Sequence, residues 1–168
     1  MENMHSLPDP EAGFDDIAPA IRISLSGVAA TIARGVCRHL RDAGYGCLLE
    51  TPLRSGRRAD VMAVGRAGEI VIVEIKSGPQ DFRTDRKWPE YRAFCDRLYF
   101  AVDRGFPQEM IPADVGLIAA DGYGAAVLRE APVHSLSGAR RKAVTIRFAR
   151  LAAARLQATA DPPSIAVL

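Results

Sequence analysis

The sequence predicts an α/β fold, a single domain in which helices flank a mixed β-sheet. Short stretches rich in β-branched residues lie between a helical stretch near 26–43 and another near 137–157. The stretch from Glu69 to Lys76 is apolar on both faces for most of its length, which is typical of a central strand covered on both sides. With 168 residues, the chain is long enough for one domain with a substantial core.

The first helix is expected from about Ser26 to Ala43, with Ser24 or Ser26 as its cap and Gly44 at its end. Its apolar face consists of residues at helical spacing, namely Leu25, Ala29, Ile32, Val36 and Leu40. The later elements are expected as strands near 45–51, 58–64 and 69–76, a helix at Pro89–Asp96, strands at Arg97–Val102, Val115–Ala119 and Ala125–Arg129, and a helix at Ser137–Gln157. The resulting order is α-β-β-β-α-β-β-β-α.

The charge of the chain is unevenly distributed. Residues Met1 to Ile21 contain five acidic side chains and no Lys or Arg, so this segment has a charge of −5. Because the whole chain has a formal net charge of +2, the rest of the chain has a charge of +7. We therefore expect a flexible acidic leader at 1–22, a folded domain at 23–158 and a loose tail at 159–168. A basic body suits a polyanionic partner, and the leader is either a solubility tail or a weak competitor of DNA for the basic face.

Two carboxylates and a lysine are expected at one end of a β-hairpin. Asp60 lies near the start of one strand, and Glu74 and Lys76 lie at the end of the next. A loop at 66–68 would pair Gly65 with Glu69, and this register places Asp60 opposite Glu74 on one face of the sheet. A slip of one residue would move Asp60 to the other face.

These residue types suit metal-assisted phosphodiester cleavage. The carboxylates of Asp60 and Glu74 offer hard oxygen ligands for Mg²⁺ or Mn²⁺, which could polarise a phosphoryl oxygen and activate water. Lys76 could position or deprotonate that water, or stabilise the charge that develops on phosphorus. The alternative is a buried structural ion pair between Glu74 and Lys76; the aligned Asp60 favours the metal site.

The same residues carry a family resemblance. Asp60 followed by Glu74-Ile75-Lys76 resembles the PD-(D/E)XK nuclease superfamily, with Ala59 in place of the usual proline. The longer strings Gly56-Arg57-Arg58-Ala59-Asp60-Val61, Val73-Glu74-Ile75-Lys76-Ser77 and Asp81 to Tyr91 resemble the MmcB-type family of bacterial DNA repair proteins, from about Gly27 to Leu156. The resemblance implies a restriction-endonuclease-like fold with an α-β-β-β-α-β core, working in DNA repair. It also implies that Asp60, Glu74 and the main-chain carbonyl of Ile75 hold the metal and that Lys76 serves catalysis.

The sequence offers one candidate for a third acid. Superfamily members often supply one from the first helix, where this chain has only Asp42 near the end. Glu50, on the next strand, is the better candidate, and the alternative is a surface glutamate at a strand end. Without Glu50, two acids favour one metal ion over two.

Several basic and aromatic residues are candidates for DNA contact. Arg57 and Arg58, beside Asp60, are expected to touch phosphates, whereas Arg54 is expected in a solvated turn. Lys87 and Tyr91 are expected at the rim of the site, and Asp81, Lys87 and Tyr91 are candidates either for positioning the substrate or for holding Lys76 in place. The last helix carries no acid, and its basic residues Arg140, Arg141 and Lys142 are either a solvated face or contacts to the DNA backbone.

The cysteine content and the length of the apolar runs limit the class of protein. The three cysteines lack metal-ligand spacing and indicate a reduced, cytoplasmic protein, and no run of residues approaches the length of a membrane span. The expected partners are DNA, other DNA repair proteins and a second copy in a homodimer. Two other functions stay open: a catalytically inactive DNA-binding module of a repair complex, and a phosphodiesterase acting on small nucleotides.

Overall fold

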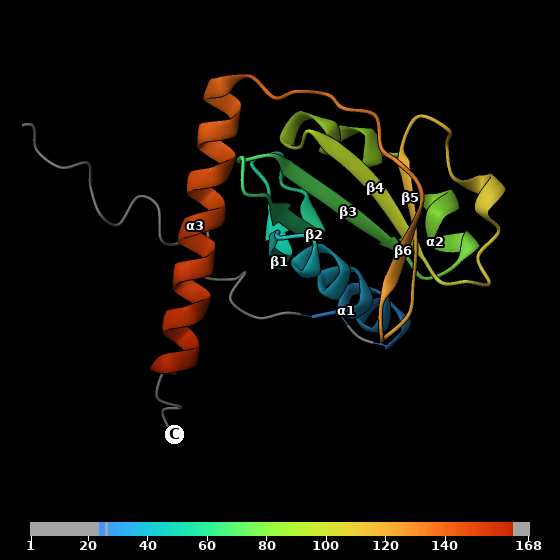
Figure 1. Cartoon of the computed structure of the whole chain (residues 1–168), viewed down its shortest axis with the longest axis horizontal. Coiled ribbons are helices and arrows are strands. Elements are labelled where there is room, and N and C mark those ends of the chain that lie inside the picture. The colour runs from blue at the N-terminus through green and yellow to red at the C-terminus, as the bar shows by residue number, and fades with distance from the viewer. Residues whose placement is uncertain (1–23, 26, 163–168) are drawn as a thin grey trace, which may run out of the picture.

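The computed structural model describes residues 24–25 and 27–162, so the predicted leader and most of the predicted tail lie outside the described residues. Its centre is a six-stranded mixed sheet in the order β1-β2-β3-β4-β5-β6 (Figure 1). The strands are β1 (Gly46–Pro52), β2 (Arg58–Val64), β3 (Ile70–Lys76), β4 (Arg97–Val102), β5 (Gly116–Ala120) and β6 (Ala125–Arg129). The pairs β3–β4 and β4–β5 are parallel and the other three pairs are antiparallel. The predicted α/β class is confirmed.

Helices cover both faces of this sheet. Helix α1 (Gly27–Asp42) packs on one face, where Ile32 and Val36 meet the odd-numbered side chains of β3. The other face is covered by α2 (Pro79–Thr84), the 3₁₀ helix η2 (Trp88–Phe94) and α3 (Gly138–Ala160). Strand β3 is buried along its whole length, as its two apolar faces predict.

Three helical segments differ from the sequence prediction. The predicted helix at Pro89–Asp96 is the 3₁₀ helix η2, and the short helices α2 and η3 (Gln108–Met110) were not predicted. Each has seven residues or fewer, too few for an apolar period to show in the sequence. Helix α3 begins after its predicted cap Ser137, which accepts a hydrogen bond from the Arg140 N–H, and it runs three residues beyond the predicted end because no Gly or Pro stops it before Pro162.

The hairpin that joins β2 to β3 has the predicted register. Val64 pairs with Ile70 and Val61 with Val73, which continues to Asp60 beside Glu74. The Gly65 N–H donates to the Glu69 carbonyl at 2.9 Å, and Gly68 has a φ of +82°, the left-handed conformation that its loop position requires. Because the register is the predicted one, Asp60 lies on the same face as Glu74 and Lys76.

An ion pair between the partly exposed Arg141 and the buried Asp96 fixes α3 to the end of the sheet. The guanidinium of Arg141 donates to both carboxylate oxygens of Asp96, at 2.6 and 2.8 Å, and also to the Gly68 carbonyl. The N–H groups of Ile70 and Leu136 donate to the same carboxylate. Burial alone would raise the pKa of Asp96, but these hydrogen bonds outweigh it and lower the pKa to about 2.

We expect Arg141→Ala to lower the urea midpoint of unfolding, because it leaves the Asp96 carboxylate buried and only partly satisfied. Urea unfolding monitored by circular dichroism measures the change. Lys142→Ala on the same helix is the matched control, since Lys142 is exposed and should change stability by less than about 0.5 kcal/mol. Equal stability of the two variants would contradict the structural role given to Arg141.

Candidate metal centre

Asp60 and Glu74 hold each other's strands through reciprocal hydrogen bonds. The backbone N–H of Asp60 donates to Oε1 of Glu74 at 3.1 Å, and the N–H of Ile75 donates to Oδ2 of Asp60 at 2.8 Å. The side chains therefore replace a backbone rung where β2 and β3 separate. The two predicted acids are brought together, and the backbone of Ile75 lies directly beside them.

The two carboxyl groups are in an environment that disfavours their charges. Glu74 is 3% exposed, and burial, with the charge of Asp60 as the next cause, raises its pKa to about 8. Burial also raises the pKa of Asp60, against the lowering effects of the Ile75 N–H and of Lys76; the charges of Asp81 and Glu50 raise it further. Such paired, desolvated acids are typical of functional sites.

Lys76 lies at the end of β3 on the same face as Glu74, and it is 5% exposed. Its Nζ is 2.7 Å from Oδ2 of Asp85, which lies just after α2. Burial would raise the pKa of Asp85, but the hydrogen bond and charge of Lys76 lower it. Asp85 was not predicted as a site residue, since nothing in the spacing of residues 81–91 distinguishes it from its charged neighbours.

The other residues expected to hold Lys76 have different roles. Asp81 accepts hydrogen bonds from the backbone and hydroxyl of Ser77 at the start of α2. Lys87 is exposed, and its backbone N–H donates to Oδ1 of Asp85. Lys76 is therefore oriented by Asp85, and the expectation that Asp81, Lys87 or Tyr91 holds it is corrected.

Glu50 lies on β1 beside Asp60 and is 1% exposed, so the alternative of a surface glutamate was wrong. The pairs Leu49–Val61 and Thr51–Ala59 flank it, and its φ of +46° interrupts the regular pairing. Its carboxylate accepts hydrogen bonds from Ser24 and lies 3.0 Å from a guanidinium nitrogen of Arg58. Burial raises the pKa of Glu50, but Ser24 and Arg58 outweigh this and lower the pKa.

The side chains of Asp60 and Glu74 suit one divalent cation that keeps some of its water ligands, and not a site in which protein ligands surround the ion. Within residues 24–25 and 27–162, no group of three or more His, Cys, Asp or Glu side chains is arranged to hold a metal ion. Asp60 and Glu74 nevertheless place two carboxylates together, and burial raises the pKa of both. Magnesium commonly binds with one or two carboxylates and keeps several waters. The two acids meet that requirement.

Of the predicted DNA-contact residues near the site, the basic ones lie at or near the surface and Tyr91 is buried. Arg57 pairs with Glu90 at 3.2 Å, Arg58 pairs with Glu50, and both the Arg58 side chain and Lys87 are exposed. Tyr91 is a correction: it is 4% exposed, and its hydroxyl donates to the Arg58 carbonyl at 3.1 Å. Burial and the nearby Glu74 raise the pKa of Tyr91, and its buried ring packs in the core, where it is not available to stack on DNA.

The basic residues of α3 also divide. The guanidinium of Arg141 is bound to Asp96, which corrects its assignment as a DNA contact. Arg147 and Arg155 donate to the carbonyls of Pro52 and Glu50 and so fasten α3 to β1. Arg140 and Lys142 are exposed, and Arg140 lies over the Phe94 ring at 5.4 Å.

The fold and the site together define a class. The chain has an α-β-β-β-α-β core, with an acid at the start of β2 and Glu74-Ile75-Lys76 at the end of β3, which is the arrangement expected from its resemblance to the restriction-endonuclease-like domains of the PD-(D/E)XK superfamily. The model of the family described as "DNA repair protein MmcB-like" matches residues 17–163. The chain therefore belongs to the MmcB-like family of DNA repair proteins.

Two solved structures are similar to this chain. A protein of unknown function from Silicibacter pomeroyi, SPO1766, is 46% identical, with a TM-score of 0.79 over 86% of this chain and 99% of the other. A repair endonuclease from Pyrococcus abyssi is 18% identical, with a TM-score of 0.36 over 53% of this chain and 43% of the other, a similarity too weak to inform fold or function. No curated protein matches the sequence. Over the described residues, every helix is too short or too polar to cross a membrane.

Proposed function

We propose that this protein is a DNA repair nuclease that hydrolyses phosphodiester bonds with Mg²⁺ or Mn²⁺ held by Asp60 and Glu74. The main-chain carbonyl of Ile75 would be a third ligand. The observation that carries this proposal is the pair of adjacent, desolvated carboxylates with a buried lysine at the end of the same strand. Burial raises the pKa of both acids, and perturbed pairs of this kind are common at functional sites.

Each residue has a chemical task in this proposal. The bound metal ion would supply a Lewis acid for a phosphoryl oxygen and an activated water. Lys76, with one N–H directed to Asp85, has further N–H groups that can donate to a phosphoryl oxygen as negative charge develops. Asp85 acts as a positioning residue, because it fixes the direction of the Lys76 side chain before substrate binds.

DNA is the proposed substrate because of the family and the surrounding charge. Arg58 and Lys87 are exposed close to the acids, and Arg140 and Lys142 are exposed on α3. Contacts from such side chains to phosphates would be independent of sequence and would weaken as salt increases. The family match to DNA repair proteins favours a DNA polymer over a mononucleotide.

A cleavage assay tests the proposal. Purified protein is incubated with labelled duplex, single-stranded and branched DNA in Mg²⁺, in Mn²⁺ and in EDTA, and products are resolved on denaturing gels. We expect cleavage that requires the metal. A second candidate, a binding module without catalysis, is favoured by the hydrogen bond that already engages Lys76. It would bind DNA without cleaving it, and Asp60→Asn would not weaken binding.

We expect Glu50→Gln to reduce cleavage by no more than about tenfold, because the carboxylate of Glu50 is already satisfied by Ser24 and Arg58 and acts from outside the ligand set. Initial cleavage rates at saturating Mg²⁺, beside those of Asp60→Asn, measure the difference. A loss as large as that of Asp60→Asn would instead make Glu50 a metal ligand and would favour a second metal ion.

A further inference from the structure

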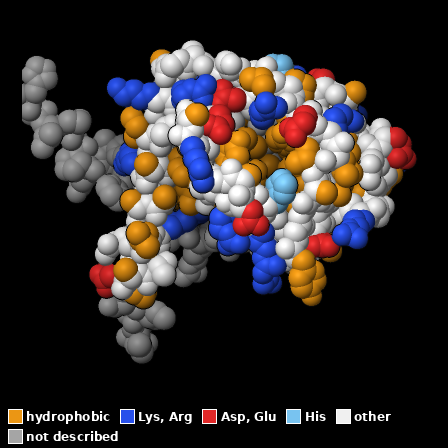
Figure 2. Space-filling view, viewed as in Figure 1, with side chains coloured by type: hydrophobic (Ala, Val, Ile, Leu, Met, Phe, Trp, Pro, Cys, Tyr) orange, Lys and Arg blue, Asp and Glu red, His pale blue; other side chains and the backbone are white. Residues whose placement is uncertain are grey.

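A groove lies beside α1, on the face of the sheet opposite to the candidate centre. It encloses about 580 Å³ and is lined by one side of α1, the turn that follows it and the first half of β1. Three arginines line it, namely Arg34, Arg38 and Arg41, and no Asp or Glu is among its described lining residues. These three residues form the arginine stripe. Figure 2 shows Lys and Arg side chains gathered at the lower edge of the domain, near the position of α1 in Figure 1.

The arginine stripe follows one line along α1. Residues at positions i, i+4 and i+7 share a face of a helix, and a rise of ~1.5 Å per residue spreads the three arginines over about 10 Å. The face of α1 that packs on the sheet is apolar and carries Ile32 and Val36 into the core. The packing of that face holds the helix in place, so the arginines form a fixed row of cations.

The arginines of the stripe keep their charge. Arg34 and Arg41 are exposed. Arg41 pairs with Asp42 at 3.7 Å, but the two side chains are 72% and 76% exposed, and water screens such a pair. Arg38 donates to the carbonyls of Gly122 and Tyr123 at 3.2 and 3.3 Å, and these neutral acceptors satisfy N–H groups without cancelling the charge. The stripe therefore presents positive charge to an anionic ligand.

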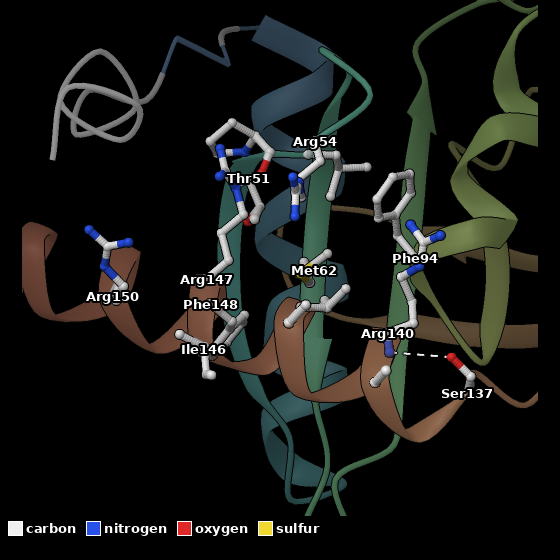
Figure 3. A pocket seen from close by; sticks show the side chains of 15 residues that line it. Thr51, Arg54, Met62, Phe94, Ser137, Arg140, Ile146, Arg147, Phe148 and Arg150 are labelled. Atoms are coloured by element: carbon white, nitrogen blue, oxygen red, sulfur yellow. Dashed lines mark hydrogen bonds between the residues drawn. The ribbon is translucent and has the colours of Figure 1, made fainter. Parts of the chain in front are cut away.

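The groove beside α1 is open to a ligand along its floor. Tyr45, Cys37 and Cys47 line it, and all three side chains are partly exposed. A wider groove of about 810 Å³ between α3 and the sheet differs in this respect, as Figure 3 shows Met62 and Phe94 at its floor. These two side chains are 1% and 6% exposed, so that floor is closed by packing. Of the two grooves, the one beside α1 is the accessible one.

We infer that the arginine stripe binds the phosphates of a second DNA arm while a first arm lies at Asp60 and Glu74. The inference rests on the proposed function and names its substrate as branched DNA. A straight duplex that lies against the candidate centre cannot also lie along α1, because the sheet separates the two and duplex DNA is stiff over about 150 base pairs. A branch point, where two arms diverge, can place one arm on each face.

An acidic peptide is the other polyanion that the stripe could attract. The segment Met1 to Ile21 has a charge of −5, and Leu25, a few residues further on, lines the groove. Its acids are unevenly spaced, however, and Asp16, the nearest of them, is nine residues before Leu25. A nucleic acid strand carries a charge at every nucleotide, so a row of cations with one arginine per helical turn suits it better.

Binding measured in EDTA tests the inference without any cleavage. Fluorescence anisotropy gives the affinity of the full chain for a labelled DNA with two diverging duplex arms and for a straight duplex of the same total length. The test variants are Arg34→Glu and Arg41→Glu. The matched control is Arg104→Glu, an equal charge change at a residue that is 84% exposed and lies outside the groove. Circular dichroism checks that each variant is folded.

We expect the parent to bind the branched DNA at least about fivefold more tightly than the straight duplex, because only the branched DNA engages both faces. Arg34→Glu and Arg41→Glu should each remove most of this preference and lower the salt dependence of branched-DNA binding by about one phosphate contact. Arg104→Glu should change the affinity by less than about twofold. Equal affinity of the parent for the two DNAs, or equal effects of Arg34→Glu and Arg104→Glu, would overturn the inference.

Two native thiols report on occupation of the groove. Cys37 and Cys47 line it, whereas Cys95 is buried. A hydrogen bond from Cys47 lowers the pKa of Cys37, which makes Cys37 the more reactive thiol. Branched DNA should slow the alkylation of Cys37 by iodoacetamide, followed by mass spectrometry, and the straight duplex should not. Protection of Cys37 by a synthetic peptide of residues 1–21, and not by branched DNA, would assign the groove to an acidic segment and overturn the inference.

These measurements separate the inference from the proposed function. If the stripe binds branched DNA as expected but no substrate is cleaved in Mg²⁺ or Mn²⁺, the nuclease proposal fails and the stripe remains a DNA-binding site. If cleavage is seen and the Arg34 and Cys37 effects are absent, the assignment of the stripe fails alone.

Discussion

Asp60→Asn and Lys76→Ala are each expected to lower metal-dependent DNA cleavage by about 100- to 1,000-fold. Asp60→Asn replaces a charged ligand with a neutral amide beside Glu74, and the metal loses one of its two carboxylates. Lys76→Ala removes a buried cation that, in the proposed mechanism, would donate to the reacting phosphate, and loss of one such group commonly costs about 100- to 1,000-fold in rate. Single-turnover rates at saturating Mg²⁺ measure both effects.

Two further variants sharpen this result. Asp42→Asn is the matched control for Asp60→Asn, because Asp42 is an exposed acid at the end of α1, and its rate should equal that of the parent. Asp85→Asn should lower the rate by about 10- to 100-fold, the usual cost of losing a group that orients a functional residue. Because Asp85 acts through Lys76, its loss should add little to Lys76→Ala. Full activity of Lys76→Ala would show that the cleavage comes from another site or protein.

Glu74→Gln should weaken divalent-metal binding by at least about 100-fold, more than the 10- to 100-fold cost of losing a supporting group. The same substitution should also remove a loss of fold stability that the parent shows at high pH. Glu74 has a pKa raised from 4.5 to about 8 by burial and by Asp60, so its protonated form is favoured in the fold. The stability that it contributes is complete below pH 4.5 and is lost as pH rises through 8. Metal binding would compensate for that loss.

Thermal melts at pH 5 and pH 9, with and without Mg²⁺, measure these effects. At pH 9 without metal, Glu74→Gln should melt about 4–8 °C above the parent, which corresponds to about 2 kcal/mol for a chain of this size. At pH 5 the difference should be smaller, since more of the parent is protonated. Mg²⁺ should raise the melting temperature of the parent at pH 9 and leave that of Glu74→Gln unchanged. If the difference in melting temperature between the parent and Glu74→Gln is the same at pH 5 and at pH 9, the claim that burial raises the pKa of Glu74 is refuted.

The centre of the fold could be predicted because its signals are local. Alternation along Glu69 to Lys76 identified a strand buried on both faces, and Gly68 set the loop that fixes the register of Asp60 against Glu74. The bounds of β2, β4 and β6 follow from the same alternation and from turn residues. These signals need no knowledge of distant parts of the chain.

The remaining parts of the site depend on contacts between distant residues. Asp85 reaches Lys76 only because the chain reverses through α2, a helix too short to predict. Glu50 is buried through an irregular strand conformation with a positive φ, which the sequence of β1 does not indicate. Arg141 was assigned to DNA because its partner Asp96 lies 45 residues away, and no pattern in either segment shows that the two form an ion pair.

Diffraction from crystals grown with Mn²⁺, measured at the manganese absorption edge, tests the metal site most directly. We predict one anomalous peak about 2.1 Å from a carboxylate oxygen of Asp60, a carboxylate oxygen of Glu74 and the main-chain carbonyl of Ile75. The peak should be absent from Asp60→Asn crystals. A manganese ion bound elsewhere, or none at concentrations that fill ordinary magnesium sites, would contradict the assignment of Asp60 and Glu74 as the metal centre.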